Sequence, residues 1–176
     1  MHPRDFPSSK TPPTALGMPP SLEELHTSSP APRQLVSLCS EGRRTLTRPR
    51  VLLADDHPPL LEATTALLKR QFDVVGTATD GATLVSEALR LCPDVIVADI
   101  TMPVLSGIDA AHRLHESAPS VKIVFLTVHS EEQFMKACMA EGALGYVLKS
   151  HMKSHLIPAI QAALVGQSYI CPFVPR

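Results

Sequence analysis

Three aspartates in this chain follow two apolar segments that could be buried strands. Asp55 and Asp56 come directly after the run 51–54 (VLLA), and Asp99 comes directly after the run 95–98 (VIVA). Because parallel strands carry their last residues to one edge of a sheet, we expect the three carboxylates to lie together. Carboxylates so close repel one another unless a cation lies among them, and a divalent, oxygen-liganded ion such as Mg²⁺ suits them. This arrangement predicts metal-assisted chemistry on a phosphoryl group.

Two later apolar segments also end in residues that could do chemistry. Thr127 closes the segment FLT, and Lys149 follows the segment GYVL. A phosphorylatable aspartate needs a metal to offset charge, a hydroxyl to hold a phosphoryl oxygen and a fixed cation opposite. With the aspartates, Thr127 and Lys149 supply this set, because phosphoryl transfer depends mainly on positioning and charge stabilisation.

The spacing of apolar residues from position 50 onward predicts strands that alternate with helices. We expect strands at about 50–55, 73–78, 94–98, 121–126 and 145–148. We expect helices at about 58–70, 81–91, 107–117, 131–141 and 153–165, with N-caps at Asp80, Ser106 and Ser130 and a helix end at Gly142. This alternation predicts an α/β fold with a doubly wound five-stranded parallel sheet and helices on both faces. In such folds ligands bind beyond the carboxyl ends of the strands.

The composition changes near residue 49. Residues 1–49 hold nine of the 17 prolines and only short apolar clusters, which predicts a Pro/Ser/Thr-rich disordered N-terminal extension. Residues 50–168 have the regular pattern of a folded domain, and residues 169–176 form a short C-terminal tail. We therefore expect one domain with an extension at each end.

Charge and hydropathy exclude several classes of protein. Residues 50–176 carry ten Lys or Arg against thirteen Asp or Glu, which argues against DNA binding by this chain itself. No apolar run approaches the ~20 residues that span a bilayer, and the N-terminus lacks the continuous apolar segment of a secretory signal. The four cysteines are scattered without a CxxC pair, which predicts reduced thiols. We therefore expect a cytoplasmic protein that does not associate with membranes.

The order Asp-Asp, Asp, Thr, Lys on successive strands resembles the receiver domain of bacterial two-component response regulators. The strings LADDHP (53–58), VADITMP (97–103) and GYVLK (145–149) carry this resemblance, which covers about residues 50–168. The Asp-Asp-His-Pro string and the ending GQSYI (166–170) make the chain most similar to receivers of the LuxR/NarL type. The resemblance implies a flavodoxin-like sheet of strand order 2-1-3-4-5.

The resemblance also implies a role for each residue of the acidic site. Asp99 would accept a phosphoryl group from a sensor histidine kinase or a phosphotransfer protein. Mg²⁺ would be held by Asp56, Asp99 and the main-chain carbonyl of Thr101, with Asp55 acting largely through water. Lys149 would pair with the Asp99 carboxylate or with its phosphoryl oxygen.

Further residues match positions that convert phosphorylation into a signal. Thr127 would move toward the phosphoryl group, and Tyr146 would follow it inward as an aromatic switch. Thr101 and His129 match positions that tune the loss of the phosphoryl group. The changed face, made by the fourth helix, the fifth strand and the fifth helix, would bind a downstream protein or a second copy. Such a protein is no enzyme beyond slow self-dephosphorylation.

Three alternatives stay open on the sequence alone. LuxR-type regulators continue into a helix-turn-helix, which this chain lacks, so it is either a stand-alone receiver or a truncated DNA-binding transcriptional regulator. A phosphatase of the haloacid-dehalogenase type also combines Asp, Thr and Lys, but it expects an Asp-x-Asp nucleophile, whereas the chain has Asp55-Asp56-His57. An interaction module with a vestigial site is the third alternative, and the intact set of five residues weighs against it.

Overall fold

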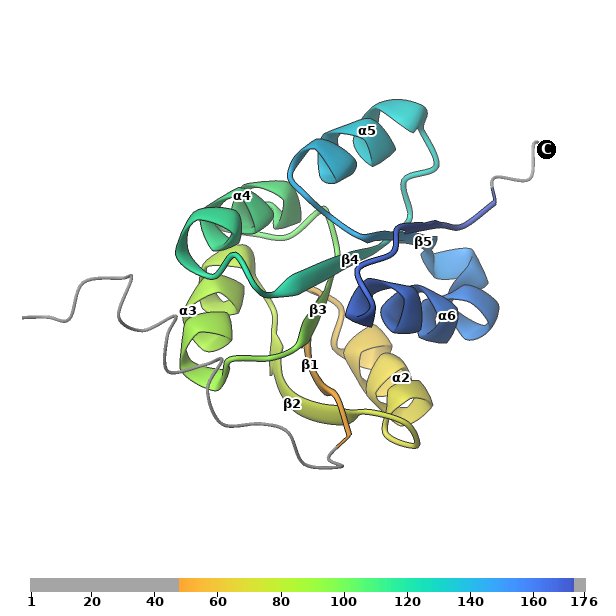
Figure 1. Ribbon diagram of the computed structural model, residues 1–176, viewed down its shortest axis with the longest axis horizontal. Helices are drawn as coiled ribbons and strands as arrows, with labels where there is room; N and C mark the ends of the chain where they lie inside the picture. The colour runs from red at the N-terminus through yellow and green to blue at the C-terminus, as the bar shows by residue number, and fades with distance from the viewer. Residues whose placement is uncertain (1–47, 173–176) are drawn as a thin grey trace, which may run out of the picture.

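Six parallel strands form one sheet in the computed structural model, which describes residues 48–172 (Figure 1). The strands are β1 (Arg50–Ala54), β2 (Asp73–Ala78), β3 (Val95–Ala98), β4 (Lys122–Thr127), β5 (Gly145–Leu148) and β6 (Tyr169–Ile170). Their order is β2-β1-β3-β4-β5-β6, and every neighbouring pair is parallel. The predicted order 2-1-3-4-5 is therefore confirmed, and β6 is an additional strand that we did not predict.

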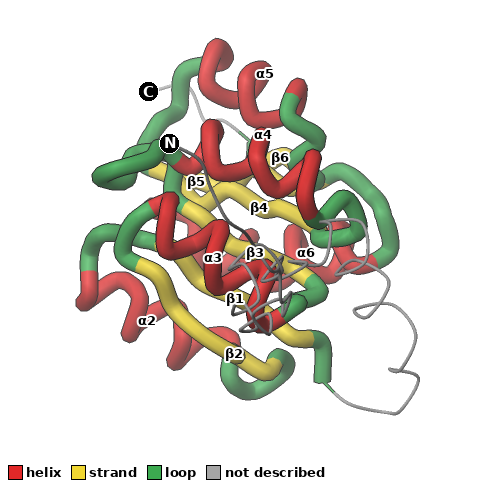
Figure 2. Tube along the Cα trace, turned by 90° about the vertical axis from the view of Figure 1, so that its left-hand side faces the viewer, coloured by secondary structure: helices red, strands yellow, loops and turns green. Residues whose placement is uncertain are grey.

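Within residues 48–172, five α-helices cover the two faces of the sheet. They are α2 (Pro58–Leu68), α3 (Gly81–Leu91), α4 (Gly107–Ser117), α5 (Glu132–Ala140) and α6 (Met152–Leu164), with one 3₁₀ turn, η1 (Lys149–His151), before α6. Helices α3, α4 and α5 lie on one face, and α2 and α6 lie on the other (Figures 1 and 2). The predicted helices are confirmed, with bounds that differ by no more than a residue or two.

The strands are buried on both faces, so the molecule has two hydrophobic cores. Residues of β1 and β3 alternate between these cores, as the period of two along a strand requires. One core lies between the sheet and α3, α4 and α5, and it includes Leu52, Ile96, Leu84, Leu114, Phe125 and Cys138. The other lies between the sheet and α2 and α6, and it includes Val51, Val97, Leu61, Leu68, Leu156 and Ile160. This double burial explains why the strands read as continuous apolar runs.

Two of the three predicted helix caps are present. The Asp80 side chain accepts from the Thr83 amide, and the Ser106 side chain accepts from the Asp109 amide. The prediction for Ser130 is wrong, because α5 begins after Glu131 and has no side-chain capping hydrogen bond. Its end is as predicted: Gly142 follows α5 with φ +81°, a conformation that glycine adopts without steric cost.

The prediction of reduced cysteines is confirmed in part. Cys138 and Cys171 are free and buried. Cys92, however, is disulfide-bonded, so the prediction is wrong there. Spacing in the sequence does not reveal which cysteines pair.

Among residues 48–172, no helix is both long and apolar enough to cross a membrane. The predictions for residues 1–47 and 173–176 lie outside the described residues, and the boundaries at 49 and 168 stay predictions.

Candidate functional site

The carboxyl ends of β1, β3, β4 and β5 bring the predicted functional residues to one edge of the sheet. The Asp55 amide donates to the Ala78 carbonyl at 3.1 Å, and the Asp99 amide donates to the Ala54 carbonyl at 2.8 Å. These bonds continue the ladder one residue past each strand, so they fix the backbone of both aspartates. Each aspartate is only 4% exposed.

Lys149 joins these two aspartates. Its Nζ lies 2.6 Å from Asp55 Oδ2 and 2.7 Å from Asp99 Oδ2. Burial of the ammonium would by itself lower the pKa of Lys149, but the hydrogen bonds to Asp55 and Asp99 outweigh burial and raise it. The ammonium therefore stays charged at neutral pH and offsets part of the charge of both carboxylates. The contact of Lys149 with Asp99 is the one that the family resemblance implies, whereas its contact with Asp55 was not predicted.

The remaining oxygens of the acidic cluster determine how a further cation could bind. Asp55 Oδ1 accepts from the His57 amide at 2.9 Å, and Asp99 Oδ1 accepts from the Ile100 amide at 2.7 Å. The Asp56 side chain is more open, at 38% exposure. Ligand atoms of Asp55, Asp56 and His57 all lie within 4.8 Å of one another. Three carboxylates against one ammonium leave a net negative charge, and their hard oxygens are the ligands that Mg²⁺ prefers.

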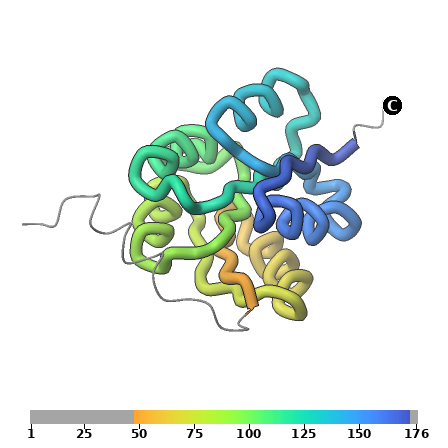
Figure 3. The backbone as a smooth tube through the Cα atoms, in the orientation of Figure 1, coloured from red at the N-terminus to blue at the C-terminus, as the bar shows by residue number. Residues whose placement is uncertain are grey.

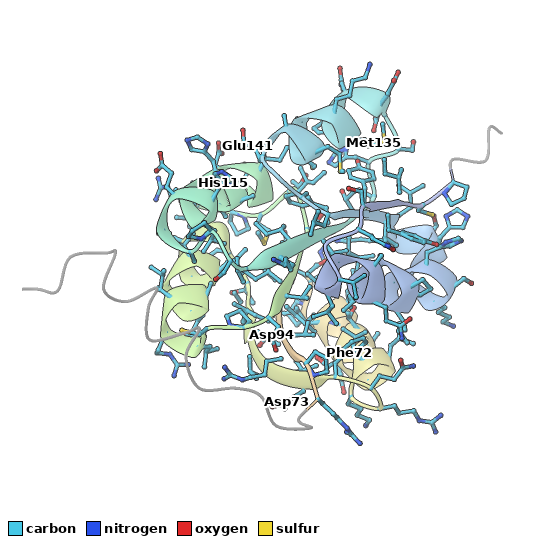
Figure 4. The ribbon with its side chains drawn as sticks, in the orientation of Figure 1. Phe72, Asp73, Asp94, His115, Met135 and Glu141 are labelled. Carbon is cyan, nitrogen blue, oxygen red and sulfur yellow. The ribbon has the colours of Figure 1, made fainter. Side chains whose placement is uncertain are left out.

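Not every aspartate at a strand belongs to this site. Asp73 begins β2 and Asp94 directly precedes β3 (Figure 4). Both therefore lie at the amino ends of the strands, whereas the acidic residues lie at the carboxyl ends. Asp94 Oδ2 accepts from the Arg50 amide at 2.7 Å. This contact is structural, as expected for an aspartate that is not at a carboxyl end.

A chain of hydrogen bonds leads from the site to β5. Thr127 is fully buried, and its Oγ1 accepts from the His129 amide at 3.3 Å. The His129 carbonyl accepts from the Tyr146 hydroxyl at 3.0 Å. Burial raises the pKa of Tyr146, so this hydroxyl remains a donor. The Nε2 atom of the His129 ring lies 2.8 Å from Thr101 Oγ1. The same ring stacks on Phe134, at the start of α5, with the ring centroids 4.1 Å apart.

Tyr146 already lies inside the protein. Its exposed fraction is 0%, and it belongs to the core beneath α3, α4 and α5. Its hydroxyl donates to the His129 carbonyl, so the whole side chain is enclosed.

The fold and this acidic edge are those of a known class of signalling domain. The family model described as the response regulator receiver domain matches residues 51–161. The chain therefore belongs to the response regulator receiver family, and it is a phosphoacceptor domain of two-component phosphorelay signalling.

Curated relatives share about the same stretch. A transcriptional regulatory protein of Bacillus subtilis, YxjL, is 40% identical over 121 residues, which are 68% of this chain and 56% of that protein. The response regulator GacA of Pseudomonas aeruginosa is 35% identical over 129 residues, which are 72% of this chain and 60% of that protein. The chain thus spans less than two thirds of the length of these relatives.

Solved structures agree in fold. A LuxR-family two-component response regulator from Aurantimonas sp. has a TM-score of 0.69 at 31% identity, covering 72% of this chain and 91% of that one. The isolated receiver domain of RcsB from Salmonella enterica, studied with the phosphomimetic BeF₃⁻, has a TM-score of 0.66 at 26% identity, covering 71% and 94%. These similarities confirm the predicted likeness to receivers of LuxR-type regulators.

Proposed function

We propose that Asp99 is the phosphoacceptor of this receiver. The observation that carries the proposal is the position of Lys149, whose ammonium lies between the buried carboxylates of Asp55 and Asp99. A fixed cation at this point can hold the attacking carboxylate in place and then stabilise charge on the incoming phosphoryl oxygens. Thr127, which ends the neighbouring strand β4, brings a hydroxyl to the same edge.

The same residues support a magnesium site. Asp56, Asp99 and the main-chain carbonyl of Thr101 would hold Mg²⁺ directly, and Asp55 would act largely through water. Asp55 suits this indirect role because its two oxygens already accept from Lys149 and from the His57 amide. Asp56 is open enough to turn toward an arriving ion. When bound, Mg²⁺ supplies the positive charge that lets a phosphoryl group approach a carboxylate.

The signal would then pass along the hydrogen bonds from Thr127. The Thr127 hydroxyl would donate its proton to a phosphoryl oxygen, and a movement of the side chain toward that oxygen would shift the hydrogen bond that Oγ1 accepts from the His129 amide. The main-chain carbonyl of His129 accepts from the Tyr146 hydroxyl, and the His129 ring stacks on Phe134. A movement of the His129 backbone would therefore shift Tyr146 on β5 and Phe134 on α5. In this chain the switch of Tyr146 would be a change in the hydrogen bond that its hydroxyl donates to the His129 carbonyl. The contact between Thr101 and His129 would tune the loss of the phosphoryl group.

The partners follow from these roles. A sensor histidine kinase or a phosphotransfer protein would supply the phosphoryl group, and a downstream protein or a second copy would bind the face formed by α5, β5 and α6. We place the receiver at residues 50–168, between the extension 1–49 and the tail 169–176, in a cytoplasmic protein.

A DNA-binding transcriptional regulator is the second candidate for the parent form. The observation that favours it is that this chain spans only part of the length of its relatives. One of these relatives is named as a transcriptional regulatory protein. Residues 50–176 carry more acidic than basic groups, so DNA binding would not come from them.

Labelling by acetyl phosphate with Mg²⁺ tests the acceptor. Intact-mass measurement should show the addition of one phosphoryl group to the full chain, and Asp99→Asn or excess EDTA should abolish it. The control Asp73→Asn, at the opposite end of the sheet, should be labelled like the wild type. Undiminished labelling of Asp99→Asn would refute the assignment, and sustained turnover of phosphate esters would favour a phosphatase instead.

A further inference from the structure

The imidazole of His57 lies beside the aspartate pair and is not used by the helix that it precedes. His57 is the N-cap of α2, yet its side chain makes no capping hydrogen bond. Its amide donates to Asp55 Oδ1 at 2.9 Å, which keeps the residue close to the acidic site. Its Nδ1 lies 3.4 Å from Asp56 Oδ1, and ligand atoms of Asp55, Asp56 and His57 lie within 4.8 Å of one another.

We propose that His57 is a nitrogen ligand of the ion held at this site, and that the site therefore binds first-row transition ions such as Mn²⁺ more tightly than its carboxylates alone would. This inference rests on the metal site proposed above. Mg²⁺ prefers oxygen ligands and keeps several waters, whereas first-row transition ions also accept imidazole, Mn²⁺ more weakly than the later ions. A nitrogen in the ligand set thus favours Mn²⁺ over Mg²⁺.

Binding of an ion by the His57 ring requires little change in its surroundings. Its side chain is 76% exposed, so little burial has to be undone before the ring turns toward an ion. Pro58, the first residue of α2, restricts the backbone directly after it. The His57 backbone is extended (φ −103°, ψ 99°), as is usual before proline, so its Cβ stays near the end of β1 while the exposed ring can rotate.

His112 offers a matched control in the same chain. Its Nδ1 lies 2.9 Å from Glu141 Oε2, and its side chain is 63% exposed. It is thus another exposed imidazole beside a carboxylate, but it lies on α4 and contacts the residue that ends α5. If any pairing of histidine with a carboxylate bound Mn²⁺, His112 would do so as well.

Electron paramagnetic resonance of the full chain loaded with Mn²⁺ tests the proposal directly. We expect pulsed spectra to show coupling of Mn²⁺ to an imidazole ¹⁴N, and His57→Ala to remove it. That variant should bind Mn²⁺ about tenfold more weakly, the scale on which metal sites lose affinity when a supporting group is removed. Its affinity for Mg²⁺, measured by competition with Mn²⁺, should change much less. His57→Gln should behave like His57→Ala, and His112→Ala should behave like the wild type.

The role of His57 would be overturned by wild-type Mn²⁺ without nitrogen coupling, or by equal weakening of Mn²⁺ and Mg²⁺ binding in both His57 variants. Loss of the coupling in His112→Ala would also overturn it, because the nitrogen would then come from elsewhere. If the metal site in the proposed function is wrong, the binding measurements give a different result. If the wild type binds neither ion, or if Asp56→Asn binds both as before, the metal site itself is wrong.

Discussion

Replacement of Lys149 by methionine tests whether the acidic edge depends on one shared cation. The ammonium lies 2.6 and 2.7 Å from two carboxylates, and the three side chains are 14%, 6% and 5% exposed. Removal of one partner from a buried ion pair leaves the other charge uncompensated and costs about 3–5 kcal/mol. Because the site opens at the edge of the sheet, we expect the lower end of that range, about 3 kcal/mol.

Urea unfolding followed by far-UV circular dichroism, in EDTA, measures this loss. The matched control is Lys136→Met, which breaks an exposed pair with Glu132 at 3.0 Å. Exposed pairs contribute about 0–1 kcal/mol. The double variant Lys149→Met/Asp99→Asn should regain part of the loss, because it removes one of the uncompensated charges. Addition of Mg²⁺ should stabilise Lys149→Met more than the wild type. A loss for Lys149→Met no larger than that for Lys136→Met would refute the reasoning.

Three further predictions concern other parts of the domain. Val104 is 86% exposed with φ +67°, so Val104→Gly should raise the free energy of unfolding by roughly 0.5–1 kcal/mol in urea titrations, whereas Val128→Gly, without a positive φ, should lower it. A Cβ on Gly107 would collide with the Asp99 carbonyl oxygen, so Gly107→Ala should cost about 2 kcal/mol or more and reduce acetyl phosphate labelling. The hydrogen bond to its carboxylate partner raises the pKa of His112 above 6.5. The pairing of protonated His112 with Glu141 should therefore stabilise the fold below pH 6.5, and this contribution should disappear as the pH rises through the raised pKa. The urea midpoint of His112→Gln should lack this pH dependence.

The layers of the fold could be predicted from the sequence because strands that are buried on both faces are apolar throughout. The runs 51–54 and 95–98 are apolar throughout, since alternate residues enter the two cores. Strand β6 escaped prediction because two residues are too few to show a period. The cap at Ser130 failed because a residue that suits a cap does not specify where the first helical turn begins.

The site was predicted in residue type but not in all its contacts. Position after a strand was enough to place Asp55, Asp99 and Lys149 at one edge. That Lys149 also reaches Asp55 depends on the exact placement of the strand ends, which spacing does not encode. In the sequence, His57 stands directly before Pro58, a position typical of the entry to a helix, and its position in space is what brings its ring to the aspartates.

The short strand β6 decides how the sheet ends on the side of β5. Its residues pair with Gly145 and Tyr146, and the backbone runs from α6 back along β5 before it leaves the sheet (Figure 3). The Tyr169 hydroxyl lies 2.6 Å from His155 Nδ1 of α6, which fastens the segment. An uncovered strand offers unpaired amides and carbonyls to other chains and invites aggregation. With β6 in place, any protein that extends the sheet at β5 must first displace it, and Pro172 ends the row of donors just beyond.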